Sequence, residues 1–439
     1  MVKYSCERCG KGFSQKSHYD SHNRRKTPCE NNADNIKSLI DKAVEEKLKE
    51  LNNKNLIIVN EEVNEEVNEE VNEEVNEEVN EEIYTVEQQP SQSKKIKINK
   101  KKLEIVDNKL KFIDLCSGIG GFHFGLKKHN CVLACDINKC CRESYETNFN
   151  IKCKEDIFEL NVSELCDFNI LCAGFPCQPF SSAGLKKGMN DDRSKVYNTI
   201  LNIVLEKQPR IVLLENVKNL LVINKGEVIK KIVSDLEKLN YNVSFSLLNT
   251  TNFGLAQNRE RVYIVCTNKN KYDISFDFNN LENMNIRKNL KDIIDLNNKE
   301  YIEEDKYVLL EPDKMKTQKS GLIFCGYLKG NLRKNGALPN TEHLSRVHKQ
   351  PNRIYHIDGV NPTLSSSEGS GRYYIYDGTG VRRLSIKECF KIMGFPDDYI
   401  FHNKTNVNYS QIGNAVSPIT INNIYNELCS QGFIHDPLV

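Results

Sequence analysis

The chain has 439 residues, of which 39% are hydrophobic, and its formal net charge is +1. This length accommodates one large domain and a small accessory one. The sixteen cysteines lack the spacing of a disulfide scaffold, and the sequence shows neither a signal peptide nor a membrane span. We therefore expect no membrane partner and a reducing intracellular compartment, the cytoplasm for a bacterial or viral protein, with the nucleus left open.

Residues 1–30 contain cysteines and a histidine at metal-ligand spacing. A CxxC pair is followed after twelve residues by a histidine, with Phe13 and Tyr19 at small-core positions. The fourth ligand is a cysteine where a second histidine is usual, and zinc accepts thiolates readily. The pattern predicts a ββα zinc finger of C2HC type that binds DNA, because residues 24–26 are basic. The predicted ligands are Cys6, Cys9, His22 and Cys29.

Residues 31–109 form a predicted linker of opposite charge blocks. Residues 60–83 repeat the letters NEEV or NEEI with period four and carry twelve glutamates. Valines at this spacing drift around a helix of 3.6 residues per turn, so no straight apolar seam forms. Without these twelve negative charges the net charge of +1 becomes +13, which indicates an anionic partner. A basic segment, residues 94–102, follows immediately.

Residues 110–272 alternate between apolar strands and helical segments. The predicted strands are 111–115, 131–135, 168–173, 210–217, 242–248 and 262–266, and the predicted helices are 122–129, 194–207 and 227–239. This alternation implies an α/β fold with a mostly parallel, Rossmann-like sheet covered on both faces. Polar residues gather at the C-terminal strand ends, where open α/β sheets bind ligands.

A glycine-rich turn, CSGIGG at 116–121, follows the first of these strands. Its glycines allow a cofactor to approach the N-terminus of the next helix. Asp136 ends the second strand about 20 residues later, a position that suits a ribose diol. Asp156 ends a third short strand at 154–157, placed to reach an adenine amino group. By itself this arrangement is typical of many nucleotide-binding proteins.

The segment GFPCQPFSSAG at 174–184 carries the most functional information. Cys177 lies between Pro176 and Gln178, directly after an apolar strand. Proline fixes its own φ and restrains the preceding residue, so the chain turns where the thiol is presented. The thiolate fraction of such a cysteine is a strong nucleophile. A buried structural cysteine is the alternative for an isolated cysteine.

Together these motifs resemble the C5-cytosine DNA methyltransferases, the family found in restriction–modification systems and in phages. The similarity covers about residues 110–435, judged by motif order. The motifs are DLCSGIGGF, GFPCQPFS, ENV at 215–217, QNRER at 257–261, ECFKIMGFPDDY at 388–399 and QIGNAVSP at 411–418. The resemblance implies transfer of a methyl group from S-adenosylmethionine to C5 of a cytosine flipped out of a specific DNA sequence.

The resemblance also assigns roles to residues of the base site. It implies that Cys177 is the covalent nucleophile, that Glu215 contacts N3 and the exocyclic amine, and that Arg261 holds the base O2. Arg259, counted with the catalytic group, would contact a phosphate or the loop. Two departures weaken cofactor contacts: Cys116 replaces a usual phenylalanine and Ala415 a frequent serine. The implied cofactor-binding residues are Gly118, Ile119, Gly120, Asp136, Asp156, Ile157, Pro176 and Asn414.

The rest of the chain is expected to read DNA and to complete the catalytic domain. Residues 273–360 correspond to the target-recognition region, a smaller domain, and residues 361–439 return to the catalytic domain. Basic and aromatic residues of the recognition region suit groove contacts with double-stranded DNA. They are Tyr327, Arg333, Lys334, Arg346, His348, Lys349, Arg353 and Tyr355. We expect the catalytic domain to be monomeric.

Two alternatives remain open from the sequence. The first is a tRNA cytosine-5 methyltransferase of the same fold, whose branch carries a CFT signature that residues 267–360 lack. The second is an inactive DNA-binding relative, against which the intact Cys177, Glu215, Arg261 and Asn414 argue.

Overall fold

The computed structural model describes residues 4–5, 12–13, 109–176, 192–329 and 341–434. The chain divides into two compact units, Met1–Ser93 and Lys94–Val439, which are described separately. In the first unit, β1 (Tyr4–Ser5) pairs with β2 (Gly12–Phe13) as an antiparallel hairpin. The four predicted zinc ligands and the NEEV repeat lie outside the described residues. No helix among the described residues is long and apolar enough to cross a membrane.

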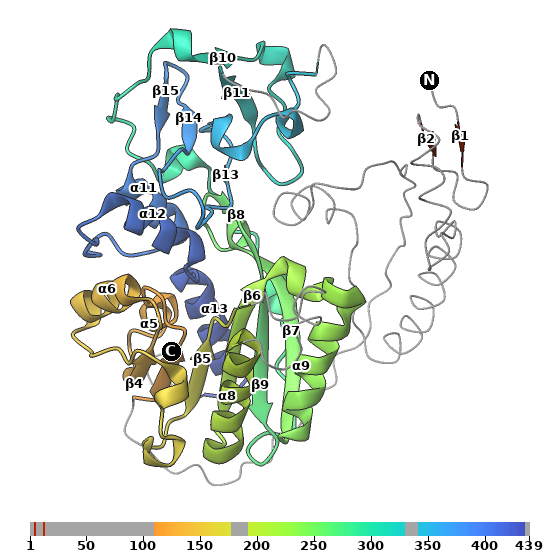
Figure 1. The fold of residues 1–439 in the computed structure, drawn as a ribbon, viewed down its shortest axis with the longest axis vertical. Coiled ribbons are helices and arrows are strands. Elements are labelled where there is room, and N and C mark those ends of the chain that lie inside the picture. Colours follow the sequence, from red (N-terminus) through yellow and green to blue (C-terminus); the bar gives the residue numbers. More distant parts are fainter. Residues whose placement is uncertain (1–3, 6–11, 14–108, 177–191, 330–340, 435–439) are drawn as a thin grey trace. The chain divides into compact units, whose positions relative to one another are not determined.

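The second unit contains a six-stranded sheet with the order β4-β3-β5-β6-β9-β7 (Figure 1). Its strands are β3 (Lys111–Leu115), β4 (Asn130–Cys135), β5 (Ile170–Ala173), β6 (Ile211–Val217), β7 (Tyr241–Asn249) and β9 (Glu260–Asn268). The first four strands are parallel, and Leu115, Ala173 and Leu214 are aligned in register. The residues that follow them therefore emerge at one level of the same edge.

The sheet is mixed: β3, β4, β5, β6 and β7 run in one direction, as a mostly parallel sheet predicts, and β9 runs in the other. Strand β9 runs antiparallel to both of its neighbours, β6 and β7. The direction of β9 follows from how the neighbouring strands are connected. A helix joins β6 to β7, and these two strands lie two positions apart in the sheet, so one strand position between them is left open. After β7 a short connection reverses the chain, and β9 fills the gap in the opposite direction. The predicted strand at 154–157 is a single bridge between Cys135 and Lys154.

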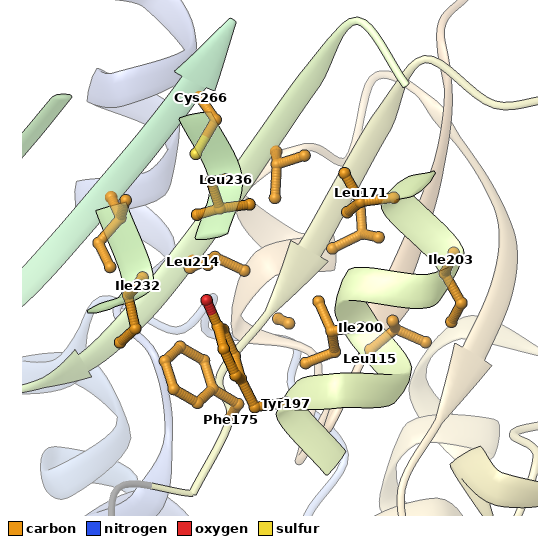
Figure 2. Packing of buried hydrophobic residues seen from close by; sticks show 14 of the residues in the cluster. Leu115, Leu171, Phe175, Tyr197, Ile200, Ile203, Leu214, Ile232, Leu236 and Cys266 are labelled. Carbon is orange, nitrogen blue, oxygen red and sulfur yellow. The ribbon is translucent and has the colours of Figure 1, made fainter. Parts of the chain in front are cut away.

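Helices cover both faces of this sheet. On one face, α8 (Asp192–Lys207) and α9 (Glu227–Lys238) pack against alternate residues of the strands. Figure 2 shows this core, with Tyr197, Ile200 and Ile203 of α8 directed at strand residues such as Leu171. On the other face, α5 (Gly121–Gly125) and α13 (Pro418–Ser430) form a second buried cluster. Because both faces are covered, the central strands β5 and β6 contain continuous apolar runs, whereas β7 at the edge alternates polar and apolar residues.

A second, five-stranded sheet has the order β10-β11-β12-β14-β15. Its strands are β10 (Tyr307–Leu309), β11 (Phe324–Leu328), β12 (Arg353–His356), β14 (Tyr374–Tyr376) and β15 (Val381–Arg383). This sheet continues beyond residue 360, where the sequence placed the end of the recognition region. The remaining described helices are α6 (Lys139–Phe149), α10 (Asn279–Glu282), α11 (Ile386–Met393) and α12 (Thr405–Asn414).

A buried ion pair fixes the point where the second sheet joins the C-terminal helices. Arg382 of β15 donates two hydrogen bonds, of 3.0 and 2.8 Å, to the carboxylate of Glu388 in α11. Arg382 also donates to the carbonyl oxygen of Asp295, on the segment that enters the second sheet. Burial alone would raise the pKa of Glu388, but hydrogen bonds from Arg382 and Ser385 outweigh it and hold the pKa below its ordinary value. The segment that enters the second sheet and the segment that leaves it are therefore both held by the Arg382–Glu388 pair.

We predict that Glu388→Gln lowers the free energy of unfolding by about 3–5 kcal/mol, because it leaves the Arg382 charge buried without its partner. Since the folded-state pKa of Glu388 is lowered, the stabilisation is present at neutral pH and is lost as the pH falls. Urea denaturation across pH measures both effects. The control is Glu227→Gln, which removes an exposed pair with Lys230 and should change stability by less than about 0.5 kcal/mol. Equal effects of the two variants would show that the buried pair contributes no more to stability than an exposed one.

Candidate active site

The glycine-rich turn after β3 is braced by the carboxylate that ends β4. Asp136 Oδ2 accepts the N–H of Gly118 at 2.8 Å, and its Oδ1 accepts the N–H of Asn138 at 2.8 Å. Gly118 and Gly120 have φ values of +54° and +85°, which glycine adopts without strain. A Cβ at Gly118 would meet nothing within 4 Å, so this turn borders open space. The turn and Asp136 therefore form one wall of a cradle at the sheet edge.

Two exposed apolar side chains flank this cradle, and the sequence analysis missed them. Ile137, directly after Asp136, is 69% exposed, and Phe158 is 46% exposed. Asp156 accepts the N–H of Phe158 at 2.9 Å, so the Asp156 carboxylate lies at the start of the short 3-10 helix that contains Phe158. An apolar residue next to a strand-end carboxylate is the signal that could have identified Ile137. Apolar side chains beside carboxylates suit a ligand with a flat ring and polar edges.

The other predicted cofactor residues differ in what they present. Ile119 and Ile157 are 1% and 7% exposed and belong to hydrophobic clusters, so only their backbone can face a ligand. Asn414, the last residue of α12, is exposed. Gln411, one turn earlier, donates to the carbonyl oxygen of Cys140 at 2.9 Å and so ties α12 to α6. The C-terminal segment therefore lies against the cofactor side of the sheet edge.

The segment before Cys177 is held at two points. Asn216 Nδ2 donates to the carbonyl oxygen of Phe175 at 2.9 Å. The Phe175 ring packs against Tyr197, with ring centroids 5.5 Å apart (Figure 2). Pro176 is half-buried and is the last described residue before the gap. Cys177 itself lies outside the described residues, so the structure fixes only the approach to it.

Glu215 lies beside this segment at the end of β6. A Cβ on Gly174 would be 3.8 Å from its Oε2, which places the carboxyl next to the chain that leads to Cys177. Glu215 is 8% exposed, and its Oε1 is 3.4 Å from Arg261 Nε. Burial raises the pKa of Glu215, while the charges of Arg261 and Arg259 oppose this effect. A raised pKa favours the protonated carboxyl, which suits a group that donates a proton to a base.

Arg259 is placed differently from the prediction of a phosphate contact. It is 2% exposed, and its guanidinium donates to the backbone carbonyl oxygens of Leu364, Gly413 and Ala415. A side chain this deeply buried and bonded to backbone has no reach to a DNA phosphate. The arginine motif alone could not reveal this, because the partners lie more than a hundred residues downstream.

In the recognition region, several residues that we expected to contact a DNA groove are buried in the protein instead. Arg353, Tyr355 and His348 are 8%, 4% and 3% exposed. Arg353 Nε donates to the carbonyl oxygen of His348, whose ring stacks on Tyr327 with centroids 4.0 Å apart. Arg346 and Lys349 are exposed, whereas Arg333 and Lys334 lie outside the described residues. Among the described basic residues of this set, Arg346 and Lys349 therefore remain available to DNA.

One described cluster has metal-ligand residue types, namely Cys140, Glu143 and His402. The Nδ1 of His402 accepts the N–H of Lys404, and its Nε2 lies 3.2 Å from Glu143 Oε2. Because Nδ1 acts as an acceptor, Nε2 carries the proton and donates to Glu143. Both ring nitrogens are thus engaged by the protein, and the geometry is that of a hydrogen-bonded crosslink between α6 and the C-terminal segment.

Comparison with known proteins identifies the family. The family described as "C-5 cytosine-specific DNA methylase" matches this chain over residues 110–430. The Type II methyltransferase M.HhaI of Haemophilus parahaemolyticus is 33% identical over 326 residues, which cover 72% of this chain and 93% of the relative. M.NgoBI of Neisseria gonorrhoeae, also a Type II methyltransferase, is 36% identical over 313 residues, 70% of this chain and 89% of the relative.

The chain belongs to the C-5 cytosine-specific DNA methylases. It is an S-adenosylmethionine-dependent DNA (cytosine-5-)-methyltransferase, and its substrate is DNA. Solved structures share the fold: the Dnmt2 methyltransferase of S. pombe superposes with a TM-score of 0.54 at 19% identity and covers 74% of this chain and 99% of its own. The methyltransferase EhMeth of Entamoeba histolytica gives 0.53 at 17% identity and covers 74% and 98%.

The cradle at the sheet edge fits the cofactor of this family. The turn at Gly118 leaves open space for a ligand, and Asp136 provides carboxylate oxygens at the end of β4. The exposed side chains of Ile137 and Phe158 offer apolar surface for an adenine ring. Cys116, in place of an aromatic residue, contributes no ring. The chemical types of these residues therefore match the ribose and adenine of S-adenosylmethionine.

We predict that Asp136→Asn weakens S-adenosylmethionine binding about tenfold or more, because an amide supplies one acceptor oxygen where the carboxylate supplies two. The turn at Gly118 or the N–H of Asn138 then loses its partner, and the ribose contact weakens as well. Isothermal titration calorimetry of the purified protein measures the affinity. The matched control is Asp167→Asn, at an exposed carboxylate. Unchanged cofactor affinity in Asp136→Asn would remove Asp136 from the cofactor site.

Proposed function

We propose that this DNA methyltransferase acts through a covalent adduct between Cys177 and the target cytosine. The proposal is supported by the closeness of Glu215 to Gly174 and by the anchoring of Phe175 through Asn216. These contacts hold the segment that precedes Cys177, as far as Pro176, at the edge where the parallel strands end. The cofactor cradle borders the same edge, because Leu115 and Ala173 are aligned in neighbouring strands.

The proposed chemistry begins with the base. The Cys177 thiolate adds to C6 of cytosine, and the electron pair of the C5–C6 double bond becomes available at C5. Glu215 donates a proton to N3 and accepts a hydrogen bond from the exocyclic amine, while Arg261 holds O2. C5 uses this electron pair to bond the electrophilic methyl group that S-adenosylmethionine would supply, and the sulfur would keep the electron pair of the broken bond and leave as S-adenosylhomocysteine. Loss of the C5 proton to a base then re-forms the double bond and expels the thiolate from C6, while N3 returns its proton to Glu215.

This chemistry requires the cytosine to leave the DNA stack, because both faces of a stacked base are covered. We propose that the second sheet supports recognition of the target sequence in double-stranded DNA. The exposed Arg346 and Lys349 precede β12 of this sheet and suit contacts with phosphates or base edges. The roles proposed for Asp136 with the ribose, Asp156 with adenine and Asn414 with the cofactor complete the site.

We further propose that residues 1–30 form a zinc finger that assists DNA binding. The hairpin of β1 and β2, in which Tyr4 pairs with Phe13, supports this proposal because a ββα finger begins with such a hairpin. Cys6 and Cys9 fall between the two strands in the sequence, the position of the CxxC pair in such a finger. His22 and Cys29 would complete a tetrahedral set of ligands.

The catalytic proposal is tested with Cys177→Ala. This variant should transfer no methyl group, while its affinity for S-adenosylmethionine stays within a few-fold of the wild type, because the thiol contacts the base. Sequencing of methylated cytosines in DNA incubated with each protein measures transfer and reveals the target sequence. The reference variant is Cys166→Ala, which changes an exposed cysteine of the same domain. Methylation by Cys177→Ala would refute the nucleophile assignment.

The finger proposal predicts one zinc ion per chain and loss of order in residues 1–30 upon chelation, because so small a core depends on its metal. A protein that begins at Lys94 should keep methylation activity and the same target sequence. It should bind DNA more weakly and with a shallower salt dependence. Elemental analysis and binding titrations at several salt concentrations measure these effects. Absence of zinc, or a changed target sequence after truncation, would contradict the proposal.

A further inference from the structure

The burial of Arg259 raises the question of why a charged side chain is kept in the interior. Its Nη2 donates to the carbonyl oxygen of Ala415 at 2.7 Å, and its Nη1 donates to the carbonyl oxygen of Gly413 at 3.1 Å. These two carbonyl oxygens flank Asn414, whose side chain is exposed. A third contact, of 3.4 Å, reaches the carbonyl oxygen of Leu364. The guanidinium therefore holds the backbone on both sides of a residue presented to the cofactor side.

The bonded carbonyl oxygens lie where α12 ends. The last carbonyl groups of a helix have no partner within the helix and carry partial negative charge. A buried guanidinium satisfies several of them at once and lies at the favourable end of the helix dipole. Arginine suits this position because its planar group directs several N–H donors from a fixed fork, whereas a lysine ammonium donates from one point.

Arg259 is also close along the chain to a residue of the base site. Arg259 and Arg261 occupy alternate positions of the chain entering β9, and β9 pairs with β6, which carries Glu215. The ionisable groups around Glu215 among the described residues are Arg261, Arg259 and Tyr263. Both arginine charges favour the ionised carboxylate and partly offset the effect of burial on its pKa. Arg259 donates hydrogen bonds to the C-terminal segment, whereas Arg261 donates to the backbone carbonyl oxygen of the neighbouring Glu260.

We propose that Arg259 is a positioning residue that couples the cofactor site to the base site, because it clamps the backbone around Asn414 and lies two residues before Arg261, which contacts Glu215. The inference extends the proposed function, since it rests on the roles given there to Asn414 and Glu215. The proposal gives different roles to the two arginines of QNRER, Arg259 and Arg261. Arg261, within 3.4 Å of Glu215, acts at the base, and Arg259 holds the cofactor segment in place.

The test separates the clamp from the charge. Arg259→Lys keeps a positive charge but loses the fork, so the affinity for S-adenosylmethionine should fall about tenfold. Amide hydrogen exchange of residues 411–416, measured without cofactor, should become faster by a similar factor. The alkaline limb of the pH dependence of kcat should stay in place. Arg259→Met removes the charge as well, which raises the pKa of Glu215 and moves that limb to higher pH.

Two further variants complete the comparison. Arg261→Lys should lower kcat while leaving cofactor affinity and the exchange of residues 411–416 as in the wild type. Gly413→Ala displaces the clamped backbone without touching the charge, because the new Cβ would lie 2.2 Å from the backbone nitrogen of Ser366. It should weaken cofactor binding and leave the alkaline limb unchanged. Gly413→Ala keeps the test conclusive if Arg259→Met fails to fold.

The proposal is overturned if Arg259→Lys binds S-adenosylmethionine like the wild type with unchanged exchange at residues 411–416. It is also overturned if Arg261→Lys affects that exchange as strongly, because the clamp would then not be specific to Arg259. Methylation of DNA by Cys177→Ala would refute the proposed function instead. The affinity and exchange measurements would still decide whether the clamp exists.

Discussion

The active site depends on hydrogen bonds between a short segment before β9 and the connection between β12 and β14 of the second sheet. The segment is β8 (Gln257–Asn258), which pairs in parallel with β13 (Asn361–Pro362). Gln257 Oε1 accepts the N–H of Leu364 at 2.9 Å, and the Asn258 carbonyl accepts the hydroxyl of Thr363 at 2.7 Å. This junction acts together with the Gln411–Cys140 hydrogen bond and the packing of α13 on the sheet to hold the C-terminal helices against the strand ends.

This junction explains how distant parts of the sequence form one site. The parallel strands supply the glycine turn, Asp136 and Glu215, all within the first half of the catalytic domain. The second sheet is inserted between that half and α12, which brings Asn414 back to the same edge. The Arg382–Glu388 pair holds the chain where it leaves the second sheet, and Arg259 binds the backbone carbonyl oxygen of Ala415 after α12. A buried charge at each point makes the return path specific, since each carries several satisfied hydrogen bonds.

The sequence predicted the parts of this arrangement that depend on local patterns. Apolar runs with polar ends located β3 to β6, and the motifs singled out Glu215 and Asp136, which the structure places near the ends of β6 and β4. Features that depend on long-range contacts were missed or misplaced. The antiparallel insertion of β9 follows from a gap in the sheet, and the burial of Arg259 from carbonyl groups more than a hundred residues away. Likewise, Arg353 and His348 look like surface residues by type but are partners in a core.

The central claim is that cytosine chemistry takes place at this sheet edge through Cys177. The most direct measurement is covalent trapping on duplex DNA that contains 5-fluorocytosine at the target position, with S-adenosylmethionine present. Fluorine cannot leave C5 as a proton does, so the methylated adduct should persist, and peptide mass spectrometry should locate the DNA on Cys177. An absence of adduct, or an adduct on another cysteine such as Cys140, would contradict the account.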